Sequence, residues 1–144
     1  MSPATAVALA APKAPPQTSR AVDVAFASDP VFVSRARRIT RALLGLWNVN
    51  GELAETIVLA VSELVTNAVE HGTGDVGLRL RCHDGELRIE VTDGNPTPAE
   101  LRLAGDDETS GRGLFLVAVL SREWGVSKDG KTTWCLFRIP AGSL

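Results

Sequence analysis

The segment that decides the fold is residues 55–72, ETIVLAVSELVTNAVEHG. Its apolar residues fall on nearly every side of a helix with about 3.6 residues per turn, which is typical of a helix buried in a protein core. Gly72 and Gly74 follow, and glycines commonly end helices. The sequence therefore predicts a long central helix from about Glu52 to His71, with these apolar residues in the core: Ile57, Val58, Leu59, Val61, Leu64, Val65 and Val69.

Four polar residues interrupt the apolar pattern of this helix: Glu63, Asn67, Glu70 and His71. Their spacing places them on one side of the helix. Burying them without partners would cost several kcal/mol, so this side must face solvent, a cavity or a ligand. Two interpretations stay open here. One is an ordinary solvated face, and the other is a magnesium site, because a hard cation takes carboxylate and carboxamide oxygens.

The residues before the central helix predict a strand and another helix. Apolar residues alternate with small or polar ones over residues 21–26, which is the pattern of a half-buried strand. Asp29 and Pro30 then suit the N-cap and the first position of a helix. We expect this helix to extend from about Val31 to Leu46.

The two sides of that helix differ in character. Ile39, Leu43 and Leu46 form its apolar line, and the other side is basic. A basic side is consistent with an ordinary solvated face or with a surface that docks an acidic partner, and both interpretations stay open. The basic residues are Arg35, Arg37, Arg38 and Arg41.

Two hairpins are expected after the central helix, because alternating segments surround Asp-Gly turns. The first has strands over 76–82 and 87–91 around Asp84-Gly85, and the second has strands over about 124–127 and 132–139 around Asp129-Gly130. A short apolar helix over Leu114–Leu120 separates the hairpins. This order of elements predicts an α+β fold, a two-layer sandwich of a mixed, mostly antiparallel sheet with helices on one face. A doubly wound sheet fits less well, because strands and helices do not alternate regularly.

Two short motifs flank a polar, acidic stretch from Thr97 to Ser110. The first, Asp93-Gly94-Asn95-Pro96, ends a strand. It is either a plain turn or a carboxylate at the mouth of a pocket, where it would accept a hydrogen bond from a ligand amine. The second, Gly111-Arg112-Gly113, precedes the short helix. It either allows close packing at the helix entry or lets backbone N–H groups approach phosphate oxygens.

Composition limits the class of protein. A chain of 144 residues and 15.3 kDa has room for one compact domain, which we expect over residues 21–144 after a disordered Ala- and Pro-rich tail, residues 1–20. A net charge of −2 provides no general attraction to nucleic acid or to anionic membrane. No apolar run approaches the roughly 18 residues that a membrane-spanning helix needs. Cys82 and Cys135 lack metal-ligand spacing and indicate free thiols in a reducing cytoplasm.

The order of three motifs resembles one known arrangement. The three motifs are E-x-x-x-N on a helix (Glu63 and Asn67), D-G-x-P after a strand (Asp93) and GRGL before a helix. They are similar to the motifs of the ATP-binding domain shared by gyrase, heat-shock chaperones, sensor histidine kinases and mismatch-repair proteins. This is the GHKL superfamily, with its Bergerat-type fold. Within it, the strings TNAVEHG and GRGLFLV look most similar to the bacterial anti-sigma factor serine kinases. The resemblance covers about residues 21–140.

The resemblance implies roles for individual residues. Asn67 matches the family's Mg²⁺ ligand, which holds the metal against the ATP phosphates. Glu63 matches the general base that acts on a substrate hydroxyl or on water. Asp93 matches the carboxylate that accepts the adenine amino group. Thr133, with Thr132 as the alternative, matches the threonine that supports the water beside adenine.

The resemblance also assigns the phosphate end of the nucleotide. Gly111 and Gly113 match the loop whose amides contact phosphate, with Arg112 placed to add positive charge, and residues 97–110 correspond to the flexible lid over ATP. The sequence departs from the family pattern at Asn95, where glycine is usual, and in the acidic character of the lid. Asn is the non-glycine residue that best tolerates positive φ, so the turn can survive the change.

These features predict a cytoplasmic regulatory protein that binds ATP and Mg²⁺. The resemblance implies that it phosphorylates Ser or Thr of an anti-sigma antagonist protein and sequesters a sigma factor. Some members of the family form homodimers, and no residue of this sequence decides between a monomer and a dimer. The alternative, motivated by Asn95 and the acidic lid, is a catalytically weak or inactive nucleotide-binding or protein-interaction module of the same fold. A sensor kinase and a DNA-binding protein are disfavoured, because we identify neither an upstream helix with a phosphoacceptor His nor a recognition helix.

Overall fold

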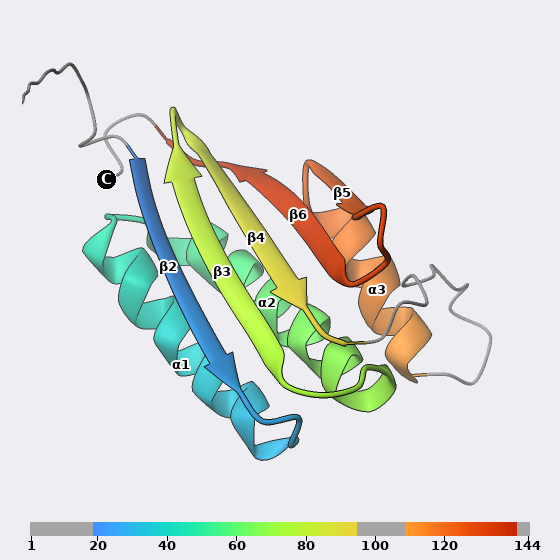
Figure 1. The fold of residues 1–144 in the computed structure, drawn as a ribbon. Helices are drawn as coiled ribbons and strands as arrows, with labels where there is room; N and C mark the ends of the chain where they lie inside the picture. The colour runs from blue at the N-terminus through green and yellow to red at the C-terminus, as the bar shows by residue number, and fades with distance from the viewer. Residues whose placement is uncertain (1–18, 95–108, 141–144) are drawn as a thin grey trace, which may run out of the picture.

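The computed structural model describes residues 19–94 and 109–140 (Figure 1). Every element predicted within these residues is present, and the observed elements in chain order are β2 (Ser19–Phe26), α1 (Val31–Leu46), α2 (Gly51–His71), β3 (Val76–His83), β4 (Glu86–Thr92), α3 (Thr109–Leu120), β5 (Glu123–Val126) and β6 (Thr132–Arg138). β2 begins two residues before the expected domain start at Ala21. The expected tail up to residue 18, Asn95 and residues 97–108 of the expected lid lie outside the described residues. The last two residues of the expected lid, Thr109 and Ser110, belong to α3.

The strands form one five-stranded sheet in the order β2-β3-β4-β6-β5. All four neighbouring pairs are antiparallel. The predicted α+β fold is confirmed. The sequence predicts a mixed, mostly antiparallel sheet, and the described strands contain no parallel pair. The reason is the position of β6. β4 and β5 run in the same direction, but β6 lies between them and is antiparallel to both.

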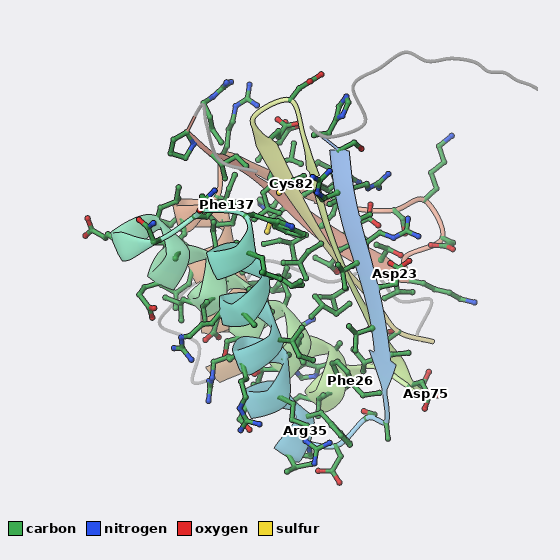
Figure 2. The ribbon with its side chains drawn as sticks, turned by 90° about the vertical axis from the view of Figure 1, so that its left-hand side faces the viewer. Asp23, Phe26, Arg35, Asp75, Cys82 and Phe137 are labelled. Carbon is green, nitrogen blue, oxygen red and sulfur yellow. The ribbon has the colours of Figure 1, made fainter. Side chains whose placement is uncertain are left out.

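The three helices cover one face of the sheet, with α2 between α1 and α3 (Figure 1). Alternate residues of each strand point into the layer between sheet and helices, and Figure 2 shows Phe26 and Cys82 there, with Asp23 on the opposite face. α2 contributes the largest share of the helical side of the core, as its apolar pattern predicts. Its buried residues are Ile57, Val58, Ala60, Val61, Ser62, Leu64, Val65 and Ala68. Two residues that the pattern places in the core differ, because Leu59 is 40% exposed and Val69 is only partly buried.

The face of the sheet opposite the helices carries ion pairs both between neighbouring strands and within one strand. The guanidinium group of Arg79 on β3 donates two hydrogen bonds to the Asp23 carboxylate on β2. Arg81 on β3 and Arg88 on β4 both donate to Oε2 of Glu90, at 3.0 and 2.6 Å. The charged residues of β3 and β4 therefore lie on this face, away from the helices.

The buried side of α1 differs from the predicted one. Leu46 was assigned to the apolar line but is 75% exposed, whereas Ala36, Thr40 and Leu44 are fully buried. Thr40 can be buried because its hydroxyl donates a hydrogen bond of 2.8 Å to the carbonyl oxygen of Ala36. A polar residue thus belongs to the buried side of α1, and the apolar pattern alone does not show it.

Two predicted local features are confirmed. The N–H of Val31 donates to Oδ1 of Asp29 at 2.9 Å, so Asp29 caps the start of α1. Asp84 and Gly85, with φ of 50° and 75°, form the turn between β3 and β4 as expected for an Asp-Gly hairpin. Within the described ranges, no helix is both long and apolar enough to cross a membrane.

Candidate functional site

The polar side of α2 exists as the spacing predicts. Glu63 and Asn67 are half-buried, whereas Glu70 and His71 are exposed. Oε1 of Glu70 lies 3.8 Å from Nε2 of His71. Within this set, Glu63 and Asn67 are the less exposed pair, one helical turn apart.

The Glu63 carboxyl group has a perturbed pKa. Partial burial raises this pKa above its ordinary value near 4.5, the positive charge of Arg37 lowers it, and the negative charge of Glu70 raises it further. Burial is the largest of these effects, so the net shift is upward. A carboxyl group whose pKa is raised is suited to accept and return protons.

The end of α2 packs directly against Asp93. A Cβ atom added to Gly72 would lie 2.5 Å from the carbonyl oxygen of Ala68 and 2.6 Å from Cγ of Asp93. Gly72 has φ −86° and ψ −178°, which any residue can adopt, so glycine is needed here for the close approach and not for its backbone freedom. The absence of a side chain at Gly72 thus lets the Asp93 carboxylate lie against the helix end.

Hydrogen bonds fix the backbone on both sides of this contact. The N–H of Gly94 donates to the carbonyl oxygen of Thr73 at 2.7 Å, which joins the end of β4 to the residues after α2. The N–H of Asp93 donates to the carbonyl oxygen of Lys131 at 2.9 Å, which joins β4 to the start of β6. The half-buried Asp93 is therefore held between two fixed segments, and this segment is more than a plain turn.

The strand register places Thr132 and Thr133, the two candidates for supporting the water beside adenine, on opposite faces of the sheet. Thr133 pairs with Val91, which is buried under the helices, so Thr133 lies on the helix side of the sheet. Thr132 pairs with Thr92, and the two hydroxyl oxygens are 2.8 Å apart on the opposite face. Of the two, Thr133 therefore lies on the same side of the sheet as the Asp93–Gly72 contact.

The Gly111–Gly113 segment lies inside a helix and not in a loop before one. α3 begins at Thr109, two residues before Gly111, whereas the sequence predicts a start near Leu114. Glycine weakens a helix by about 1 kcal/mol relative to alanine but does not forbid it. Leu114 and Val117 are buried in the core, and this packing offsets that cost. In a helix that begins at Thr109, the N–H groups of Thr109, Ser110 and Gly111 lie too close to its start to bond to carbonyl oxygens one turn back in the helix.

The polar side of α2, the Asp93 segment after β4 and the start of α3 lie at one end of the sandwich. Figure 1 places the end of α2, the end of β4 and the start of α3 at the same edge of the molecule, and α3 packs along α2. The sequence had not singled out the Gly72–Asp93 contact. Nor had it placed Arg37 against α2, although Ser62, a small polar residue on an apolar helix, was a signal that a partner lies there.

The oxygen ligands present fit a magnesium–nucleotide complex. Among the residues that the structure describes, no three His, Cys, Asp or Glu side chains are grouped so as to hold a metal ion. Asn67 offers a carboxamide oxygen, and Mg²⁺ commonly takes one or two protein oxygens and completes its shell with phosphate and water. Such a site needs the nucleotide as well as the protein, and the fixed carboxylate of Asp93 provides an acceptor for an amino group.

A two-layer α+β domain with these motifs at one end defines an ATP-binding module. The histidine kinase-like ATPase domain family matches residues 26–137, and the chain belongs to this family. A comparison with curated proteins gave no match.

Proposed function

We propose that this protein is an ATP-dependent serine/threonine kinase that also acts as an anti-sigma factor. The observation that supports the kinase most strongly is the half-buried Glu63 with its raised pKa, one turn from Asn67 on α2. The strings TNAVEHG and GRGLFLV support this subgroup of the family by resemblance.

Asp93 would select the base of the nucleotide. A carboxylate is an acceptor only, so it pairs with the amino group of adenine and not with the carbonyl that guanine has at the same position. Gly72 supports this role, because it leaves the carboxylate close to the helix end. Thr133 would support a water beside the base, and Thr132, on the other face of the sheet, is the weaker candidate.

Phosphoryl transfer would follow from the residues of α2 and α3. Glu63 accepts the proton of a Ser or Thr hydroxyl while the hydroxyl oxygen bonds to the terminal phosphorus of ATP. The bond from that phosphorus to the bridging oxygen breaks, and ADP leaves. Asn67 would hold Mg²⁺, which neutralises charge on the phosphates when it is bound. The backbone N–H groups at the start of α3, including that of Gly111, would contact phosphate, and Arg112 and Gly113 belong to the same segment.

Replacement of the base tests this mechanism. Glu63→Gln keeps the size of the side chain but cannot accept the proton, so we expect phosphoryl transfer from labelled ATP to fall about 10²- to 10⁴-fold with ATP binding retained. The matched control is Glu52→Gln, an exposed carboxylate in the first turn of the same helix. An active wild type that loses nothing in Glu63→Gln would show that Glu63 is not the base.

The second candidate is a nucleotide-binding or protein-interaction module without transfer activity. Asn95 at the usual glycine position and the acidic lid sequence favour it. The two functions differ in one measurement. A module binds ATP but gives no Glu63-dependent release or transfer of phosphate, whereas a kinase gives both.

The proposed partners are a sigma factor and an anti-sigma antagonist protein. α1 offers a docking surface for an acidic partner, because it has no acidic residue in its first turn and its Arg35, Arg38 and Arg41 are exposed. Charge reversal at these three arginines should weaken binding of the partner, and the effect should diminish with added salt. Unchanged binding of both candidate partners by the reversed variant would remove this surface from the proposal.

A further inference from the structure

Arg37 differs from the other arginines of α1 in its surroundings. Arg35, Arg38 and Arg41 are exposed, whereas Arg37 is half-buried. Its Nη1 donates a hydrogen bond of 3.0 Å to Oγ of Ser62 on α2. Ser62 itself is only 4% exposed, so the anchor of this guanidinium group lies inside the contact between the two helices.

This anchor places a permanent positive charge beside the candidate base. Ser62 directly precedes Glu63, and an arginine stays protonated at every pH at which proteins are folded. The guanidinium group has five N–H donors in a planar fork, so the bond to Ser62 leaves donors for other groups. A charge held on a buried hydroxyl moves less than one on a free surface side chain.

The other charges near Glu63 do not replace this one. Glu70, two turns further along α2, repels a charged Glu63. The described side chains of α3, Leu114–Leu120, carry no charge, and the charged residues of β3 and β4 lie on the far face of the sheet. Among the described residues, Arg37 is the cation whose charge acts on the Glu63 carboxyl group.

We propose that Arg37 is a positioning residue for Glu63, held on Ser62 so that its guanidinium group lies near the Glu63 carboxylate and stabilises its charged form. This inference rests on the proposed role of Glu63 as the base. It assigns Arg37 a function separate from the exposed arginines of α1, because the side chain serves the site and not a docking surface.

Two measurements on Arg37→Met test the proposal. The first, carbon NMR of the Glu63 carboxyl group, needs no activity, and we expect its pKa to rise relative to wild type. The second is steady-state phosphate release from Mg·ATP over a range of ATP concentrations, where we expect kcat to fall about tenfold or more with KM for ATP unchanged. Arg37→Lys should recover part of kcat, since it keeps the charge but not the fork. Arg79→Met, on the opposite face of the sheet, is the matched control.

The outcomes separate this inference from the proposed function. An unchanged Glu63 pKa in Arg37→Met overturns the inference, whatever the activity. A raised pKa in a protein whose wild type releases no phosphate supports the electrostatic role of Arg37 and overturns the kinase function. If Arg37→Met does not fold, Ser62→Ala removes only the anchoring hydroxyl and should raise the same pKa by a smaller amount. No shift in that variant overturns the inference equally.

Discussion

Replacing Gly72 by alanine should disturb both the stability of the domain and its affinity for ATP. The new Cβ would lie 2.6 Å from Cγ of Asp93, whereas ordinary contacts begin near 3.4 Å, so Asp93 or the end of α2 must move by about 0.8 Å. Overpacking of this kind costs about 1–3 kcal/mol. The lower entropy of the unfolded chain with alanine returns about 0.4–1 kcal/mol, because φ of Gly72 suits alanine. We expect a net loss of about 1–2 kcal/mol in the free energy of unfolding.

The effect on ATP follows from the displacement of Asp93. A hydrogen bond to a charged group contributes about 1.5–3 kcal/mol, so its loss should raise Kd for ATP roughly 10- to 150-fold. Urea denaturation measures the first effect and calorimetry the second. Gly45→Ala is the matched control, since a Cβ added to Gly45 meets nothing within 4 Å. That control should gain up to about 1 kcal/mol of stability and keep its affinity.

The result that would refute this reasoning is specific. If Gly72→Ala is as stable as Gly45→Ala and binds ATP as wild type does, the end of α2 does not press against Asp93. If stability falls but affinity is unchanged, the end of α2 is too crowded for a side chain, by Ala68 as well as by Asp93, and Asp93 does not take part in binding the nucleotide.

Three other predictions follow from burial. The raised pKa of Glu63 means that its protonated form stabilises the native state below pH 4.5, and that this contribution is lost as the pH rises through the folded-state pKa. The free energy of unfolding of wild type should therefore fall relative to that of Glu63→Gln over this rise, as measured by urea titrations at several pH values. A difference between the two proteins that stays constant with pH would contradict this prediction. Burial raises the pKa of Cys82 to about 11 and of Cys135 to about 12, so neither thiol should react with iodoacetamide at pH 8 until urea is added, and rapid labelling of the native protein would show that the core is open. Leu44→Ala should lower the free energy of unfolding by about 2–5 kcal/mol and Leu46→Ala by less than about 0.5 kcal/mol, as measured by urea denaturation. The apolar line of α1 alone suggests the reverse order, and equal losses would place Leu46 in the core.

Local chemistry explains why much of the fold could be predicted from the sequence. The Asp84-Gly85 turn fixes a hairpin because few residues adopt its two positive φ values, and the Asp29 cap acts on a residue only two positions away. α2 was equally clear, since a helix that is apolar nearly all round has to be buried. Each of these signals involves neighbours in the chain.

The features that the sequence did not show depend on contacts between distant segments. Thr40 is buried by the elements that cover α1, and its hydroxyl is satisfied by the carbonyl oxygen of Ala36 in the same helix. Arg37 faces inward because Ser62 of α2 lies opposite. Neither can be inferred from apolar spacing on α1. The choice between Thr133 and Thr132 likewise needs the register of β4 on β6, which a single strand sequence does not contain.

In the candidate site, too, the features set by neighbouring residues could be predicted, and those set by distant segments could not. Glu63 and Asn67 are one turn apart on a helix, so their spacing was sufficient to group them. Gly72 was predicted only as the end of α2, and its contact with Asp93 appears when β4 is placed beside that end. The start of α3 at Thr109 was missed because glycines usually lie outside helices, and the packing of the residues that follow overrides this preference.

The central claim is that this end of the domain binds ATP together with Mg²⁺, with Asn67 as the protein's ligand to the metal. The measurement that tests it most directly is calorimetry of ATP binding with and without Mg²⁺, on wild type and on Asn67→Ala. We predict binding to wild type that Mg²⁺ strengthens, and loss of that strengthening in Asn67→Ala. Absence of binding at millimolar ATP, or a magnesium effect that survives in Asn67→Ala, would contradict the account.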